Sequence, residues 1–296
     1  MKIGFLTASH LPNLTADDRL VIPYLATAGI EVVPVVWTEA MPAGLHALIM
    51  RSTWAYYQQA SAFRDWLSSL ALLDLPIWNP PATLLANLDK RYLLDLHNHG
   101  WPIVPTEVLA PGEASHYAHC LQARDWHDVI VKPAVSASGH ETHRLPSTAT
   151  LPASLCALNQ CTALLVQPFC QSIQTEGEWS LMFLGGQFSH AVNKRPGPNQ
   201  HLVQEDYGGQ TRAAAPPPDL LQLAQRLFAA ECGDCLYARL DFVRVDDSYA
   251  LMELELLEPS LYLAQEPGAA ARWAGAVATA LAQILVDNPA SGQPRP

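Results

Sequence analysis

Two alternating apolar runs near the C-terminal end of the chain constrain its fold most strongly. Residues 236–257 contain both runs, separated by a polar turn at residues 246–248, and this pattern predicts a β-hairpin. Pairing in such a hairpin brings Asp241 close to Glu253. The two-residue period of a strand then places Glu253 and Glu255 on one face. The sequence therefore predicts a sheet with three carboxylates on one face.

Three carboxylates that share a face repel one another unless a cation lies between them. Hard oxygen ligands of this kind suit Mg²⁺ or Mn²⁺, and Mg²⁺ held by few carboxylates usually completes its shell with nucleotide phosphate. The alternative is a solvated acidic face on an edge hairpin. The flanking residues are strongly apolar, which favours a buried cluster paired with a cation.

Composition limits the partners of this chain. Of its 296 residues 49% are hydrophobic, which is enough for a large core and two or three subdomains. The net charge is −11 and no Lys/Arg run occurs, so we expect no nucleic-acid partner. We recognise no signal peptide and no apolar run long enough for a membrane helix. We expect a cytoplasmic protein with small-molecule partners and no membrane partner. The sequence is compatible with either a monomer or a homodimer.

Strands and helices alternate in the first part of the chain. We expect strands at 2–6, 31–36 and 46–50 and helices at 17–28 and 63–73. Short connections between them predict a parallel sheet covered on both faces. The later part should hold strands at 129–132 and 164–167, a hairpin over 179–193, a mobile polar loop at 199–209 and helices at 220–232 and 269–286. The residues from 288 onward should be disordered.

Two lysines stand out in a chain that is poor in lysine. Lys90 opens a predicted helix, and Lys132 ends an apolar strand that runs into the small-residue loop 134–139. A lysine at the buried end of a strand needs an anionic partner. The loop would let backbone N–H groups approach phosphate oxygens, and the alternative is an ordinary turn. It lacks the P-loop pattern.

Further segments carry candidate polar groups. The apolar strand 165–169 ends at a proline, where free main-chain groups could read an adenine edge, or it is simply the end of a core strand. Arg195 and Arg212 bracket the polar loop. They could stabilise charge on a transferred phosphoryl group, or they are solvated loop cations.

A polar and aromatic segment follows the third expected strand. Functional residues of open parallel sheets lie beyond the carboxyl ends of the strands. Arg51, Ser52, Thr53 and Tyr56 occupy that position and could hold the carboxylate of an amino-acid-like substrate. The alternative is a set of core aromatics with a surface arginine.

Residues 87–263, taken in this order, resemble the ATP-grasp superfamily of carboxylate–amine ligases. The resemblance implies two nucleotide lysines, a phosphate-covering loop, an adenine-contacting strand end, an acid at the ribose, basic residues facing phosphate and a set of metal ligands. Lys90 and Lys132 would be the lysines, Ser136, Ser138 and Gly139 would belong to the loop, and Gln167 and Phe169 would form the strand end. Glu176 or Glu178 would be the acid at the ribose, and Arg195 and Arg212 would be the basic residues. The metal ligands would be Asp241, Glu253 and Glu255. Many members carry Asn where Glu255 stands.

Residues 51–54, 89–94 and 253–260 further resemble the branch of D-cycloserine-forming (O-ureido-D-serine) cyclo-ligases. The implied fold is α/β: an N-terminal parallel-sheet domain at 1–86, a central lid at 87–163, a C-terminal ATP-grasp subdomain at 164–290 and a tail at 291–296. The implied cofactors are ATP and Mg²⁺ or Mn²⁺. The implied reaction activates a carboxylate as an acyl phosphate for attack by an amine, in the same molecule for a cyclo-ligase. A kinase-like phosphotransferase and a non-catalytic nucleotide-binding protein are the alternatives.

Overall fold

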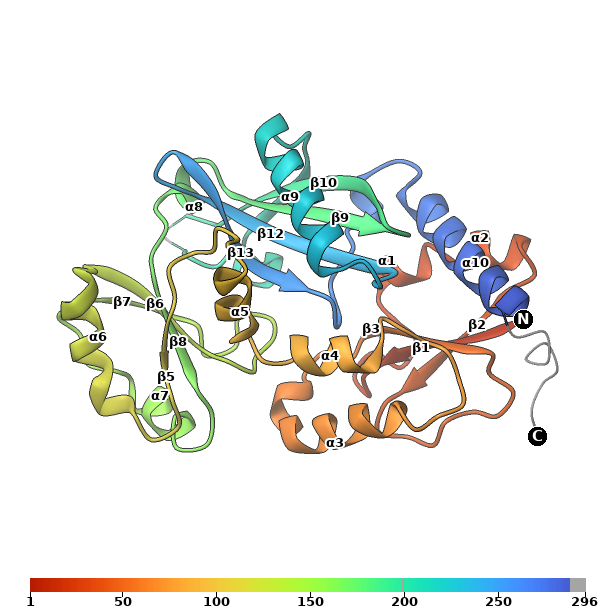
Figure 1. The fold of residues 1–296 in the computed structure, drawn as a ribbon, viewed down its shortest axis with the longest axis horizontal. Coiled ribbons are helices and arrows are strands. Elements are labelled where there is room, and N and C mark those ends of the chain that lie inside the picture. Colours follow the sequence, from red (N-terminus) through yellow and green to blue (C-terminus); the bar gives the residue numbers. More distant parts are fainter. Residues whose placement is uncertain (199, 288–296) are drawn as a thin grey trace.

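Three β-sheets organise the chain in the computed structural model, which describes residues 1–198 and 200–287 (Figure 1). The expected tail and its disorder lie outside the described residues. None of the described helices is both long and apolar enough to cross a membrane. The α/β architecture expected from the sequence is confirmed.

The first sheet is parallel and has the order β2-β1-β3-β4. Its strands are β1 (Lys2–Thr7), β2 (Glu31–Val36), β3 (Ala47–Ser52) and β4 (Ile77–Trp78). Alternate residues of β1 enter two different cores, as the strand period requires. Ile3 and Phe5 pack with α2 (Ile22–Thr27) and α10 (Ala269–Asp287), whereas Leu6 packs with α3 (Ala60–Leu70) and α4 (Pro81–Asn87). The predicted parallel sheet, covered on both faces, is thus confirmed.

The single helix expected at residues 17–28 is two short helices. The first, α1 (Ala16–Arg19), begins where the side chain of Thr15 accepts a hydrogen bond from the backbone N–H of Asp18. The second, α2, has Pro23 in its first turn. Proline lacks the N–H that a continuous helix needs there, so the chain turns before α2 begins.

The second sheet is antiparallel, with the order β5-β8-β6-β7. Its strands are β5 (Glu107–Leu109), β6 (Asp128–Pro133), β7 (His143–Pro146) and β8 (Leu164–Pro168), and α6 (Tyr117–Arg124) and α7 (Ala153–Leu158) cover it. Because β8 pairs with both β5 and β6, sheet membership favours a boundary after β8 rather than after residue 163. The division of the chain into subdomains stays a proposal.

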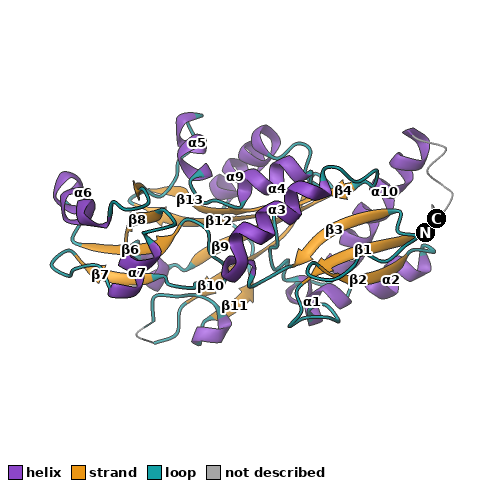
Figure 2. Ribbon diagram, turned by 90° about the horizontal axis from the view of Figure 1, so that it is seen from below, coloured by secondary structure: helices purple, strands orange, loops and turns teal. Residues whose placement is uncertain are grey.

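The third sheet has the order β11-β10-β9-β12-β13. Its strands are β9 (Glu178–Leu184), β10 (Gln187–Arg195), β11 (Gln210–Ala213), β12 (Tyr237–Val245) and β13 (Ser248–Glu255). Helices α5 (Tyr92–Asn98) and α9 (Pro218–Glu231) pack on the same side of this sheet (Figure 2). A short helix, α8 (Ser172–Thr175), precedes β9. The two predicted hairpins, β9–β10 and β12–β13, are both present.

Candidate nucleotide and metal site

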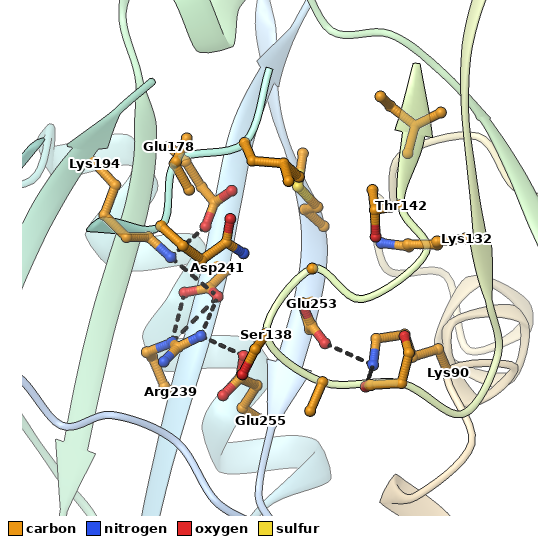
Figure 3. A pocket seen from close by; sticks show the side chains of 18 of the residues that line it. Lys90, Lys132, Ser138, Thr142, Glu178, Lys194, Arg239, Asp241, Glu253 and Glu255 are labelled. Atoms are coloured by element: carbon orange, nitrogen blue, oxygen red, sulfur yellow. Dashed lines mark hydrogen bonds and ion pairs between the residues drawn. The ribbon is translucent and has the colours of Figure 1, made fainter. Parts of the chain in front are cut away.

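A pocket of about 260 Å³ is lined by residues of both the second and third sheets (Figure 3). The second sheet contributes Lys132 from β6 and Gln167 from β8. The third sheet contributes Asp241 from β12 and the two glutamates of β13. The pocket therefore brings together residues that lie more than one hundred positions apart in the sequence.

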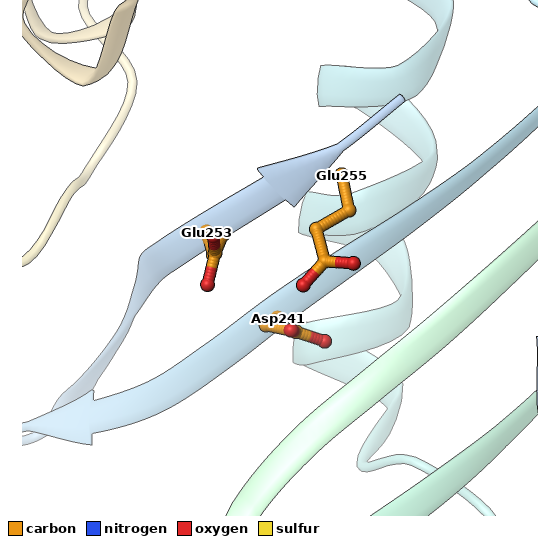
Figure 4. Close-up of side chains that lie close together, drawn as sticks. All are labelled: Asp241, Glu253 and Glu255. Atoms are coloured by element: carbon orange, nitrogen blue, oxygen red, sulfur yellow. The ribbon is translucent and has the colours of Figure 1, made fainter. Parts of the chain in front are cut away.

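The three predicted metal ligands lie together. Asp241 and Glu253 are register partners across β12 and β13, and Glu255 projects from the same strand as Glu253 (Figure 4). One oxygen from each carboxylate lies within 4.8 Å of the others. A hard divalent cation prefers such a set of oxygens, so the donors fit Mg²⁺ or Mn²⁺.

Cations of the protein surround these acids. Nη2 of Arg239 donates to Oδ2 of Asp241 at 2.9 Å and also to Glu255. Nζ of Lys194 lies 3.5 Å from Oδ2 of Asp241. Burial raises the pKa of Asp241, but Arg239 and Lys194 outweigh it, so the net shift is downward. Asp241 is therefore held as a carboxylate although it is buried.

The two glutamates differ in charge balance. Burial raises the pKa of Glu253, but Lys90 and Lys132 outweigh burial and the net shift is downward. For Glu255 burial dominates over Arg239, and its pKa rises to about 8. A divalent cation bound beside Glu255 would oppose the effect of burial and favour its carboxylate form.

Both predicted phosphate lysines line the pocket. Nζ of Lys90 lies 3.2 Å from Oε1 of Glu253 and donates to the carbonyl of Ser136 at 2.5 Å. Burial lowers the pKa of Lys132, and Glu253 opposes that effect without overcoming it. An anionic partner would stabilise the charged form of this buried ammonium.

The small-residue loop also lines the pocket. Ser138 and Gly139 both have left-handed backbone conformations, with φ of 54° and 70°. A side chain added at Gly139 would meet Leu202 and Tyr207 at 3.4 and 3.5 Å. The polar segment that follows β10 therefore closes against the predicted phosphate loop.

The end of β8 lines the pocket as the sequence predicts. Gln167 donates from Nε2 to Oγ1 of Thr106, and the ring of Phe169 lies 3.6 Å from the guanidinium carbon of Arg144. Of the two acids expected at the ribose, Glu178 lines the pocket. Glu176 lies outside its lining and pairs with Arg244 at 2.7 Å.

The structure places neither Arg195 nor Arg212 in the pocket lining. Both are exposed, and each side chain donates to a residue two positions earlier, Asn193 and Gln210 respectively. The strand period explains this: Lys194, one residue before Arg195, points inward, so Arg195 points outward.

Sequence reasoning missed the two inward cations. Lys194 stands opposite Glu178 in the β9–β10 register, and Arg239 stands opposite Glu255 in the β12–β13 register. Arg239 also lies two residues before Asp241 and shares its face. A two-residue step back from Asp241 would have found Arg239, whereas the inward position of Lys194 depends on the pairing of β10 with β9.

The segment expected to bind substrate is mostly internal. Arg51 is buried, and its Nε donates to Oδ1 of Asp18 at 2.8 Å. Ser52 hydrogen-bonds with Thr7, and the hydroxyl of Thr53 points to the sulfur of Met50. Of the four expected substrate residues, only Tyr56 lines the pocket. Nε and Nη2 of Arg51 are already bonded, to Asp18 and to the carbonyl of Pro259, and Asp18 neutralises its charge, so it is not a free anchor for a carboxylate.

Comparison with known proteins places this chain in a family. Residues 3–79 match the family model for the N-terminal domain of the D-cycloserine synthetase DcsG. The cycloserine biosynthesis protein DcsG of Streptomyces lavendulae is 30% identical over 249 residues, which cover 79% of this chain and 83% of that protein. This chain belongs to the DcsG family.

Solved structures agree with this family. The crystal structure of D-cycloserine synthetase DcsG superposes with a TM-score of 0.86 at 27% identity, covering 95% of this chain and all of that one. D-alanine–D-alanine ligase from Bacillus anthracis superposes with a TM-score of 0.66 at 15% identity, covering 97% and 96% of the two chains. The DcsG-family chain has the ATP-grasp fold and is an ATP-dependent ligase that forms a C–N bond.

Proposed function

We propose that this protein activates the carboxylate of a small amino-acid-like substrate as an acyl phosphate, and that an amine of the same molecule then closes a ring. The observation that carries this proposal is the pocket itself, which is lined both by three clustered carboxylates and by two buried lysines. Its similarity to a cycloserine biosynthesis protein supports ring closure rather than the joining of two molecules.

The residues of the pocket fit ATP and Mg²⁺. Asp241, Glu253 and Glu255 would hold the metal, while Lys90, Lys132 and the loop at 136–139 would contact the phosphates. The metal would neutralise charge on the transferred phosphoryl group. Gln167, Phe169 and Glu178 also line the pocket. Gln167 and Phe169 would hold the adenine, and Glu178 would contact the ribose.

The chemistry needs no nucleophilic side chain. A carboxylate oxygen of the substrate attacks the γ-phosphorus, and ADP leaves. The amine nitrogen then attacks the acyl carbon, phosphate leaves, and the amine gives up one proton. Arg239 and Lys194 both pair with Asp241 of the acid cluster, so they would stabilise negative charge on the carboxylate and phosphate oxygens.

Product analysis tests this proposal. The protein is incubated with ATP, Mg²⁺ and O-ureido-D-serine, and separately with pairs of amino acids. We expect ADP, free phosphate and a cyclised product from the single substrate. If an amide forms only when a second amine is added, the protein joins two molecules and does not close a ring. A stable phosphorylated product without free phosphate would instead show a kinase-like enzyme.

A further inference from the structure

The predicted phosphate loop, residues 134–139, packs on the core of the first sheet. Val135 and Ala137 contact the hydrophobic core that β1, β3 and α3 share. Between them, the carbonyl of Ser136 accepts a hydrogen bond from the hydroxyl of Tyr56 at 3.4 Å. The loop follows a strand of the second sheet, yet residues of the first sheet's core anchor its start.

A pair of stacked rings anchors the other end of this loop. The rings of Tyr57 and His140 have centroids 4.4 Å apart and planes inclined by 24°. Stacking of this kind stabilises a contact beyond the apolar area that it buries. Tyr57 lies in the 3₁₀ helix Tyr56–Gln59, which follows β3, so the stack joins the first sheet to the loop.

The backbone around His140 has an unfavourable conformation. Ser138 and Glu141, which both carry side chains, have positive φ values of 54° and 50°, and φ of Gly139 is 70°. Residues with a Cβ are disfavoured in this left-handed region, and they stay there where surrounding contacts hold the chain. The stack with Tyr57 is such a contact, so the conformation of the turn depends on the first sheet.

The part of the loop that faces the pocket lies between these two anchors. Residues 137–139 line the pocket, with Ser136 before them and His140 after them. Tyr57 and His140 are not among the described residues that line the pocket. They would therefore act on a bound nucleotide only through the position of the loop.

We propose that Tyr57 is a positioning residue for the nucleotide phosphates, because its stack on His140 holds the far end of the phosphate loop on the first sheet. Without the ring, residues 137–139 lose one of their two anchors, and their backbone N–H groups are no longer held toward the phosphates. This inference rests on the proposed function, in which the loop contacts the phosphates of ATP.

Hydrogen exchange of the free protein tests the anchor without any nucleotide. In Tyr57→Ala the amides of residues 137–141 should exchange about two- to tenfold faster, the factor that corresponds to the loss of one aromatic stack. Exchange in β1 and β3 should keep its wild-type rate. Tyr57→Phe keeps the ring and should match wild type. The control Tyr24→Ala, at a tyrosine of α2 that is 47% exposed, should also match wild type.

Binding tests whether the anchor acts on the phosphates. Titration measures the Kd of a non-hydrolysable ATP analogue with Mg²⁺, and the Kd of adenosine, which has no phosphate. Tyr57→Ala and His140→Ala should each raise the Kd of the ATP analogue about two- to tenfold and leave that of adenosine unchanged. The double variant should bind no more weakly than either single variant, because both changes remove the same stack.

The outcomes separate this inference from the proposed function. Wild-type exchange in Tyr57→Ala, an unchanged Kd of the ATP analogue, equal losses for adenosine, or losses that add in the double variant would overturn the role of Tyr57. His140 is exposed, so His140→Ala keeps the test decisive even if Tyr57→Ala folds poorly. A ring product from O-ureido-D-serine together with any of these results would leave the proposed function standing. The expected Kd changes without a ring product would retain the role of Tyr57 and remove the proposed reaction.

Discussion

Arg239 is the residue that ties the acid cluster to the rest of the pocket. It donates to Asp241, pairs with Glu255 and reaches the carbonyl of Ser260. The three acids would hold a metal, which would supply positive charge at the cluster. Arg239 would then be placed to pair with an anionic group of the substrate.

Glu253→Gln tests the metal assignment at the residue scale. The amide keeps the size of the side chain but loses the charge that would bind the cation, so turnover should fall at least about 100-fold. The measurement is ADP release over a range of Mg²⁺ concentrations, with Glu39→Gln at an exposed position as the control. Near-normal turnover in Glu253→Gln, or in excess EDTA, would remove the metal site.

Glu258 gives a pH-dependent prediction. Burial raises the pKa of this pocket-lining acid from 4.5 to about 7. The unfolded chain ionises near 4.5, so the free energy of unfolding falls as the pH rises from about 4.5 to about 7 and stays lower above that. Glu258→Gln cannot ionise and should be more stable than wild type at pH 8, by about 1–3 kcal/mol.

Urea unfolding at pH 5 and pH 8 measures this effect. The gain should be larger at pH 8 than at pH 5, and Glu39→Gln should show no such difference. A gain of equal size at both pH values would show that Glu258 is not held in its neutral form by burial.

At the scale of elements, two loops meet over the pocket. Leu202 and Tyr207 lie against Gly139, and His201 lies 3.4 Å from the carbonyl of Thr142. The sequence predicted a mobile polar loop at 199–209, and we predict that this loop closes over the pocket as a lid. The described residues 200–209 include a short 3₁₀ helix, Glu205–Tyr207. The lid role stays a prediction.

A pair of glycine variants separates backbone strain from closure of the pocket. Gly139→Ala and Gly186→Ala both place a side chain at positive φ, of 70° and 80°, so each should lose about 1–2 kcal/mol of stability. Gly186 lies in the β9–β10 turn with open space around its Cα. Only Gly139→Ala should also weaken ATP binding, measured by titration. Equal ATP affinity in both variants would show that the loop around Gly139 does not contact the nucleotide.

Limited proteolysis tests the lid directly. Free protein should be cut within residues 200–209, and ATP with Mg²⁺ should slow that cut by ordering the two loops. Cutting at the same rate in both states would contradict a lid.

At the scale of the whole molecule, hydrogen bonds and a shared hydrophobic core join the first and third sheets. Nδ2 of Asn79 donates to the carbonyls of Tyr237 and Leu256, and the hydroxyl of Tyr237 donates to the carbonyl of Met50. Ile3 from β1 and Met182 from β9 belong to one hydrophobic core. These contacts fix one wall of the pocket, while the second sheet forms the other.

The local periods of the sequence predicted the parallel sheet, both hairpins and the three clustered acids, because each depends on neighbouring residues. They did not predict which partners meet across sheets. Arg51 stands at a strand end, but Asp18 and Pro259, 33 and 208 residues away, decide its role. We expected Arg195 rather than Lys194 as a phosphate-facing cation, because the sequence of β10 alone does not show which of its faces is inward. The pairing of β10 with β9 decides that.

The central claim is that a substrate carboxylate is activated by ATP. The most direct measurement uses O-ureido-D-serine labelled with ¹⁸O in its carboxylate, incubated with the protein, ATP and Mg²⁺. Mass spectrometry of the released phosphate should show one ¹⁸O atom per phosphate, since the acyl phosphate breaks with that oxygen on phosphorus. Phosphate released without ¹⁸O, alongside ring product, would contradict the account.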